Sequence, residues 1–273
     1  MKKLALLFLF AVGLGVVWAL LFSTSGSDIS VSQSLEAPLR GTLLGRDSLG
    51  RDLLLRIFQG AQVSLGIGIS SSLMALFLGL IYGGVSAMGP RPLDSLMMRV
   101  SEVLMSLPSL MFMAVLALTL KSQSNSSSAF FVLFWVLSLS SWMPVSKLTR
   151  NLILAEKSQD YVEAARAMGA SQPRIFLKHL APNLFSPILI YWSLQIPHAI
   201  LAEGLLSFLG FGVKSPAVSW GALMQEGWKA LANYPHLLLA PAAILFLTVL
   251  SLNICLESFR KSQDPRLKWE KYS

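Results

Sequence analysis

Two ionisable residues, His198 and Glu203, lie within the apolar segment Leu184–Leu206. Ionisable groups inside a membrane are costly and usually face protein or water, so such residues often mark a functional site. One interpretation is that both side chains line a substrate pathway. The alternative is that Glu203 lies at the outer membrane interface and accepts hydrogen bonds from loop backbone. Pro187 and Pro197 in the same segment predict local bending.

Other residue types that could do chemistry are scarce. The three histidines (His179, His198 and His236) are scattered, which predicts no metal site. The only cysteine, Cys255, lies in the last apolar segment, so no disulfide within the chain and no cysteine metal cluster is expected. No Gly-x4-Gly-Lys-[Ser/Thr] phosphate loop occurs, because the sequence has no Gly-Lys pair. We therefore expect no catalytic residue, no cofactor and no ATP-binding motif in this chain.

The apolar residues form blocks long enough to cross a bilayer, which takes roughly 20 residues of helix. The composition is 54% hydrophobic and 13% charged, and hydrophobic runs of this length exclude the strands of a membrane barrel. We therefore predict an all-α membrane protein, a bundle of about six transmembrane helices. The six blocks are Leu4–Phe22, Val63–Ala87, Val100–Leu120, Ala129–Val145, Leu184–Leu206 and Leu237–Leu256.

The basic residues predict the orientation of these helices. Of the 22 Lys and Arg, 15 fall in the amino-terminal tail, the carboxyl tail and the segments 88–99 and 146–183, and 7 fall in the other connections. Loops rich in Lys and Arg stay on the cytoplasmic side. Both termini are therefore expected inside. Leu4–Phe22 is expected to be a retained span, with a cleaved signal peptide as the alternative.

The segment 146–183 is too polar to span a membrane and is patterned like two short helices. Ser158 is expected to cap the first helix, which ends at Gly169 because glycine tolerates a left-handed stop. Ser171 is expected to cap the second helix, which runs to Pro182. Two short helices at an angle predict a rigid cytoplasmic knob that a soluble partner could grip.

Two outer segments complete the organisation. The segment 23–62 repeats Gly-Arg-Asp, at Gly45-Arg46-Asp47 and Gly50-Arg51-Asp52, where glycine permits tight turns and adjacent opposite charges are able to pair. In the segment 207–236, apolar residues recur at helical intervals over Trp220–Leu231, which predicts an interfacial helix. The expected organisation is an N-terminal helix with its outer segment (1–62), a five-helix core with the 146–183 loop (63–258) and a cytoplasmic tail (259–273).

Within the segment 146–183 the sequence resembles the permease subunits of binding-protein-dependent ABC importers. The family signature of Glu-Ala-Ala, a later Gly and an ending with Leu and Pro corresponds here to Glu163-Ala164-Ala165, Gly169 and His179-Leu180-Ala181-Pro182-Asn183. The ending is similar to that of the peptide and nickel permeases. Further stretches resemble the second permease of dipeptide and oligopeptide systems: Leu44–Asp52, Ala202–Gly210 with Trp220-Gly221, and Asp264-Pro265-Arg266.

This resemblance implies a transport subunit in a bacterial cytoplasmic (inner) membrane. It implies that Glu163, Ala164, Ala165, Gly169, His179, Leu180 and Pro182 form the loop that couples the permease to an ATPase. It also implies a second permease subunit, an extracytoplasmic binding protein and two cytoplasmic subunits that use ATP and Mg. Alternating access would then move dipeptides or oligopeptides inward, with nickel or another small solute as the alternative cargo.

Two rival classes remain at this point. A secondary transporter typically has inverted repeats and paired intramembrane ions, and neither is evident in this sequence. A structural membrane subunit without a transport role would not need the Glu-Ala-Ala knob.

Overall fold

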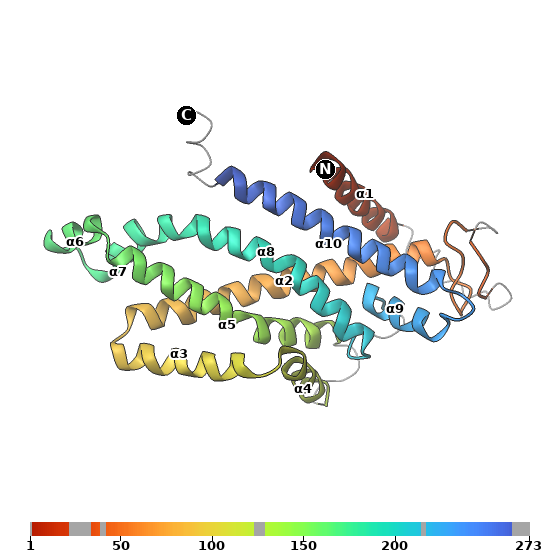
Figure 1. The fold of residues 1–273 in the computed structure, drawn as a ribbon, viewed down its shortest axis with the longest axis horizontal. Coiled ribbons are helices and arrows are strands. Elements are labelled where there is room, and N and C mark those ends of the chain that lie inside the picture. Colours follow the sequence, from red (N-terminus) through yellow and green to blue (C-terminus); the bar gives the residue numbers. More distant parts are fainter. Residues whose placement is uncertain (1, 22–33, 39–41, 123–128, 214–216, 264–273) are drawn as a thin grey trace.

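Helices form the whole framework of the computed structural model, which describes residues 2–21, 34–38, 42–122, 129–213 and 217–263 (Figure 1). Within these residues the only strand-like pairing is a single bridge between Arg46 and Asp52. The helices are α1 (Lys2–Leu21), α2 (Leu53–Met88), α3 (Arg91–Ser106), α4 (Ser109–Ser122), α5 (Ala129–Lys157), α6 (Asp160–Ala167), α7 (Gln172–Ile175), the π-helical turn η2 (Phe176–Leu180), α8 (Ala181–Phe208), α9 (Trp220–Lys229) and α10 (His236–Gln263).

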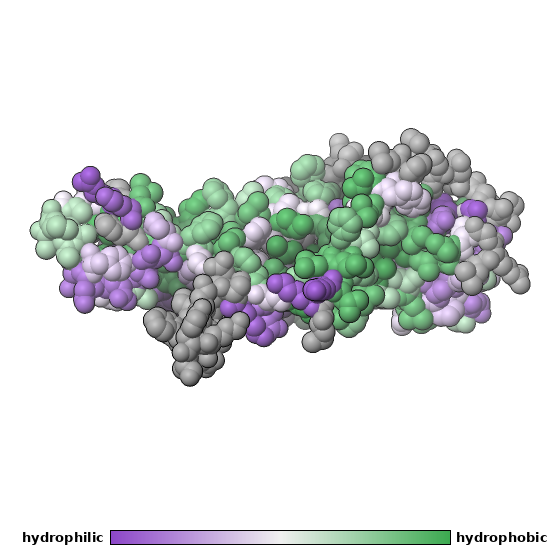
Figure 2. Space-filling view, turned by 90° about the horizontal axis from the view of Figure 1, so that it is seen from above, coloured by the Kyte–Doolittle hydropathy of each residue, from purple (hydrophilic) through white to green (hydrophobic). Residues whose placement is uncertain are grey.

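The predicted membrane spans are largely confirmed. Five helices, α1, α2, α5, α8 and α10, are long and apolar enough to cross a bilayer. Each of the last four contains one predicted block, and α1 contains the first block as far as Leu21, since Phe22 lies outside the described residues. A sixth span results if α3 and α4 are counted together. Figure 2 shows hydrophobic residues over much of the middle of the molecule, hydrophilic residues at both ends, one of which carries α6, and a further hydrophilic group along the lower edge of the middle. This distribution is that of a bundle whose middle lies in lipid.

The third block, Val100–Leu120, is not one straight helix, which corrects the expectation. It is divided between α3 and α4, whose axes differ by 93°. Leu107 adopts an extended conformation with φ −72° and ψ 139°. Pro108 causes the break, because its ring disfavours helical geometry in the preceding residue and it has no amide hydrogen to donate.

Helix α5 continues well past the expected end of its block. The block was expected to stop at Val145, but the helix runs to Lys157 and includes the polar first part of the segment 146–183. Two contacts hold this extension against neighbouring helices. The Arg150 guanidinium contacts Asp94 of α3, and Lys157 Nζ donates to the carbonyl oxygen of Ala87 in α2 at 2.9 Å. The projection at this end of the bundle therefore begins at residue 158.

Glycines allow α2 and α5 to approach closely. A Cβ atom added at Gly79 would lie 2.4 Å from Val145 Cβ, and one added at Gly83 would lie 2.3 Å from the Ser146 carbonyl oxygen. Gly79 and Gly83 form a Gly-x-x-x-Gly pattern, which places both glycines on one helix face. The close packing of α2 against α5 therefore requires residues without side chains at positions 79 and 83.

Helix α9 was predicted to be interfacial, and the structure places its apolar side against the bundle. Trp220 is fully buried, and its indole Nε1 donates to the Ile57 carbonyl oxygen at 3.0 Å. Leu223 is 2% exposed and belongs to the same cluster of buried residues. Ser219 caps the helix, because its hydroxyl oxygen accepts from the Ala222 amide at 3.3 Å. The helix ends at Lys229, short of Leu231.

Candidate functional site

The projection at one end of the bundle consists of α6, α7 and η2 (Figure 1). Its inner side is apolar: Val162 and Ala165 of α6 are buried with Ile175 and Leu180 against Ile153 of α5. Glu163 and Ala164, from the same Glu-Ala-Ala tract, are exposed. One face of α6 therefore anchors the projection, and the other is free to contact another molecule.

Gly169 ends α6 as predicted. Its φ of +82° lies in the left-handed region, and a Cβ atom added there would have no neighbour within 4 Å. The Ala170 amide donates to the Ala165 carbonyl oxygen at 3.1 Å, which is the long hydrogen bond of a glycine helix stop. Two large apolar side chains of the projection are strongly exposed: Met168, directly before the stop, at 83%, and Leu177 of η2 at 70%.

The first expected cap and the end of the second short helix need correction, whereas Ser171 directly precedes α7 as expected. Gln159, and not Ser158, precedes α6, and the Ser158 hydroxyl donates to the Ala155 carbonyl oxygen of α5. Beyond Ser171, α7 and η2 pass directly into α8. Pro182 lies in the first turn of α8 and does not end a helix, because a proline there displaces no helical hydrogen bond. The His179 side chain lies outside the described residues.

A polar cluster ties the projection to two spanning helices. Tyr161 of α6 donates a short hydrogen bond to the Glu156 carboxylate at the end of α5, and Asn183 of α8 donates to the Tyr161 hydroxyl at 3.0 Å. The hydrogen bond to Glu156 raises the pKa of the Tyr161 phenol. Movement of α6 would therefore be passed to both α5 and α8.

His198 and Glu203 do not come together, although they belong to one helix. Glu203 is fully buried, and its carboxylate accepts from the hydroxyls of Ser64 at 2.7 Å and Ser207 at 2.6 Å. The Ser64 hydroxyl in turn accepts from the Trp220 amide at 3.2 Å. Glu203 thus joins α8 to α2 and α9, which fits the structural alternative, with serine hydroxyls as the donors. His198 is exposed, and a place for it on the pathway stays a prediction.

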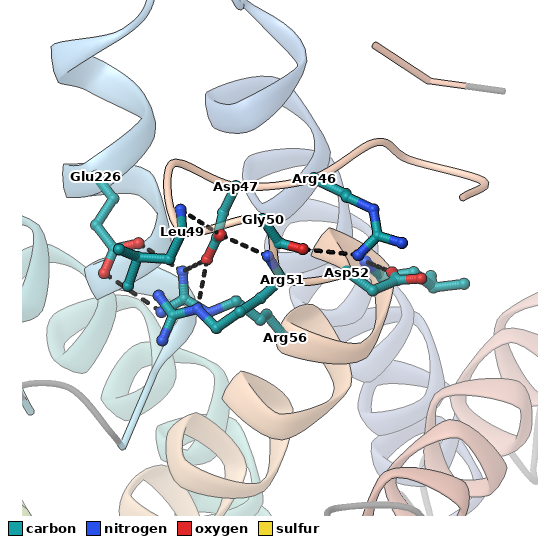
Figure 3. Close-up of polar contacts among 9 residues, drawn as sticks. Arg46, Asp47, Leu49, Gly50, Arg51, Asp52, Arg56 and Glu226 are labelled. Atoms are coloured by element: carbon teal, nitrogen blue, oxygen red, sulfur yellow. Dashed lines mark hydrogen bonds and ion pairs between the residues drawn. The ribbon is translucent and has the colours of Figure 1, made fainter. Parts of the chain in front are cut away.

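The Gly-Arg-Asp repeat builds a buried charge network at the other end of the bundle (Figure 3). The Asp47 carboxylate accepts from Arg51 Nε at 2.7 Å and from an Arg56 guanidinium nitrogen at 2.8 Å. It also accepts the backbone amides of Leu49 at 2.8 Å and Arg51 at 2.9 Å. Arg56 is 3% exposed and reaches Glu226 of α9 at 2.6 Å. The network fixes the outer segment to the start of α2 and to α9.

Gly169→Val is expected to loosen the coupling projection. A β-branched residue at φ +82° costs roughly 1–2 kcal/mol, and relief of that strain would redirect α7 relative to α6. In a complex with the ATP-using subunits that the sequence resemblance implies, the variant should assemble weakly or hydrolyse ATP independently of substrate. Stimulation of ATPase activity by substrate measures the effect, and Gly84→Val is a matched control in open space. Wild-type stimulation in Gly169→Val would mean that the projection is only a linker.

Comparison with known proteins supplies the family. Residues 75–269 match the model of the family described as binding-protein-dependent transport system inner membrane component. The chain is 32% identical to the oligopeptide transport system permease protein OppC of Bacillus subtilis, over 98% of this chain and 87% of that protein. It is also 32% identical to the dipeptide transport system permease protein DppC of the same organism, over 96% of this chain and 80% of that protein.

Solved structures give the same fold. A chain of the MetNI methionine ABC transporter in an inward-facing conformation matches with a TM-score of 0.63, covering 77% of this chain and 95% of that chain at 16% identity. A chain of an amino acid ABC transporter matches with a TM-score of 0.58, covering 76% of this chain and 93% of that chain, also at 16% identity. The helical arrangement is therefore that of an ABC transporter membrane subunit.

Proposed function

Because the chain belongs to the binding-protein-dependent transport system inner membrane component family, we propose that it is a permease subunit of an ATP-driven importer for dipeptides or oligopeptides. The observation that carries the substrate class is the similarity to oligopeptide and dipeptide permeases along nearly the whole chain. A likeness of this extent includes the outer segment, the bundle and the projection together.

The proposed machine needs partners. A second permease subunit would complete the pathway, an extracytoplasmic binding protein would deliver the peptide, and two cytoplasmic subunits would bind ATP and Mg. The sequence supports the assignment of ATP binding to other subunits, since it contains no phosphate-binding loop motif. The chain would line the translocation pathway and change conformation during transport, and it would not act as an enzyme.

The projection supports an alternating-access mechanism. Its buried residues pack on α5, and its exposed residues include Glu163, Met168 and Leu177. Closure of the ATPase pair would push the projections of the two permeases together. Tyr161 and Asn183 would pass that displacement to α5 and α8, which opens the outer face to receive peptide. Hydrolysis would reset the pair.

Reconstitution tests the function. The chain is expressed with a second permease, the two ATPase subunits and the binding protein, and the purified complex is placed in proteoliposomes with ATP and Mg inside. Labelled dipeptide and tripeptide should accumulate in an ATP-dependent manner. Omission of this chain should abolish accumulation. Accumulation of nickel without peptide would overturn the substrate class, and ATP-independent uptake would favour a secondary transporter.

The proposed orientation places both termini and the projection in the cytoplasm. Its basis is the excess of Lys and Arg in the segments on that side. With Cys255 replaced by Ser, single cysteines are placed at Ser171 beside α7 and at Asn233 between α9 and α10, both of which are exposed. An impermeant thiol reagent added outside intact cells should label the cysteine at 233 and spare the one at 171. Reversed labelling would contradict the importer and its orientation together.

A further inference from the structure

A charged groove lies between α3 and α5, in the half of the bundle that continues into the projection. Its volume is about 590 Å³, within the range of small-molecule sites. Five of the residues that line it are charged. The lining residues are Asp94, Ser95, Met98, Arg99, Glu102, Lys147, Arg150 and Asn151.

One side of the groove is fixed by a two-point ion pair. Arg150 Nε and a second guanidinium nitrogen each lie 2.5 Å from an oxygen of the Asp94 carboxylate. The Ser86 hydroxyl of α2 donates to the same carboxylate at 2.5 Å. These contacts satisfy Asp94 and hold the first turns of α3 against α2 and α5. The charges of Asp94 and Arg150 are therefore already paired, and these two side chains are not expected to bind a ligand.

The remaining charged residues are poorly satisfied. Lys147 Nζ and a Glu102 carboxylate oxygen are 3.5 Å apart, with the side chains 33% and 53% exposed. In the described part of the chain, no carboxylate lies within ion-pair distance of Arg99, whose side chain is exposed. Arg99, Lys147 and Glu102 thus present two cations and one anion to the groove. This pattern is complementary to a zwitterion whose carboxylate needs the larger share of donors.

Apolar residues of α3 flank the groove. Leu96 and Val103 are 64% and 65% exposed, and their spacing of three and four residues from Arg99 places them on the same helix face as Arg99. Such apolar surface suits lipid or another subunit, whereas charged groups in a membrane bundle usually face water or protein. Arg99 therefore lies at the border between the apolar face of α3 and the charged groove.

We propose that this groove binds the charged ends of a peptide on the inner half of the translocation pathway, with Arg99 and Lys147 contacting the carboxylate and Glu102 the ammonium group. The proposal rests on the proposed function, since it assigns peptide contacts to this importer. The pair between Lys147 and Glu102 is weak enough for a peptide to replace it. The pair of Asp94 and Arg150 joins α3 to α5 on one side of the groove.

Import of paired peptides tests the groove. The reconstituted importer receives saturating binding protein preloaded with a tripeptide that has either a free or an amidated carboxyl terminus, so that differences in binding-protein affinity do not enter the rate. Arg99→Gln and Lys147→Gln should each lower the maximal import rate of the free tripeptide roughly tenfold, as expected for loss of one charge-assisted hydrogen bond. Import of the amidated tripeptide should stay within about twofold of wild type. Arg99→Lys should restore part of the loss.

The controls separate the alternatives. Arg91→Gln removes a charge from the same helix outside the groove and should import both peptides like wild type. If Arg99→Gln imports the free and the amidated tripeptide at equal rates, whether normal or reduced, the groove does not bind the peptide carboxylate. The proposed function would still stand, because the wild type imports peptide. A defect of Arg99→Gln that appears only in vesicles with anionic lipid would overturn the peptide site in favour of a lipid headgroup. A wild type that imports neither peptide contradicts the proposed function itself.

Discussion

Gly83→Val is expected to separate the central helix pair and to leave little folded protein. The added Cβ would lie 2.3 Å from the Ser146 carbonyl oxygen, 2.9 Å from Thr149 Cβ and 3.1 Å from the Arg150 amide nitrogen. Two of these three atoms belong to the α5 backbone and cannot move without moving the helix. Overpacking costs about 1–3 kcal/mol, and a clash with backbone atoms belongs at the upper end of that range. The shift would also displace Arg150 from Asp94, which adds a second loss.

The measurement is thermal stability and monodispersity of the detergent-purified chain, followed by size-exclusion chromatography after heating. Gly84→Val is the matched control, because the neighbouring glycine has no atom within 4 Å of its added Cβ and its φ is not left-handed. The control should elute like wild type, while Gly83→Val should aggregate at a much lower temperature. Equal behaviour of the two variants would mean that α2 and α5 are not in close contact in the membrane.

The membrane spans could be predicted because they depend on local composition alone. Every apolar block except Val100–Leu120 lies in a single helix over its described residues, since lipid forces the backbone to satisfy its own hydrogen bonds. The bend between α3 and α4 was also readable, from Pro108 and the restricted residue before it, but the uninterrupted apolar run obscured it. The Gly79-x-x-x-Gly83 pattern was likewise visible as a packing signal. The helix that packs against these glycines could not be assigned, because the sequence alone does not show which helices are in contact.

In the segment 146–183, the features that depend on local sequence were predicted correctly, and those that depend on tertiary contacts were not. Gly169 ends α6 as glycine commonly does. The cap at Ser158 was wrong, because α5 continues to Lys157 and draws the serine hydroxyl onto its own last turn. The extension of α5 depends on Asp94 and Ala87, which are distant in sequence. Pro182 was interpreted as a stop but stands in a first turn, where it fits equally well.

The outer network shows a further limit of sequence reasoning. Adjacent Arg and Asp residues of the repeat were expected to pair, but Asp47 pairs with Arg51 and Arg56, and Arg46 lies 3.3 Å from Glu36. The turn at Gly50, with φ +76°, brings Arg51 back towards Asp47 and explains the first of these contacts. Glu226 could not have been assigned, because only the fold brings α9 beside the start of α2.

Asp47→Ala is expected to destabilise the chain by about 3–5 kcal/mol, the usual cost of removing one partner from a buried ion pair. Asp47 is 4% exposed, and its loss leaves the Arg56 guanidinium buried with only the half-exposed Glu226 for compensation. The Leu49 and Arg51 amides would lose their acceptor as well, so the turn that precedes α2 would loosen. Thermal unfolding of the purified chain in detergent measures the loss.

Two further variants test the cause of that loss. Glu36→Ala removes a carboxylate of the same outer segment, but its pair with Arg46 is partly exposed, at 34% and 23% for the two side chains, so it should cost no more than about 1 kcal/mol. Asp47→Ala combined with Arg56→Met removes the uncompensated charge and should recover much of the stability, because an apolar side chain is tolerated where a paired charge was buried. If the double variant is as unstable as Asp47→Ala alone, the loss of stability comes from the loosened turn before α2 and not from the unpaired Arg56 guanidinium. If Asp47→Ala is as stable as Glu36→Ala, the network does not hold the outer segment to α2 and α9.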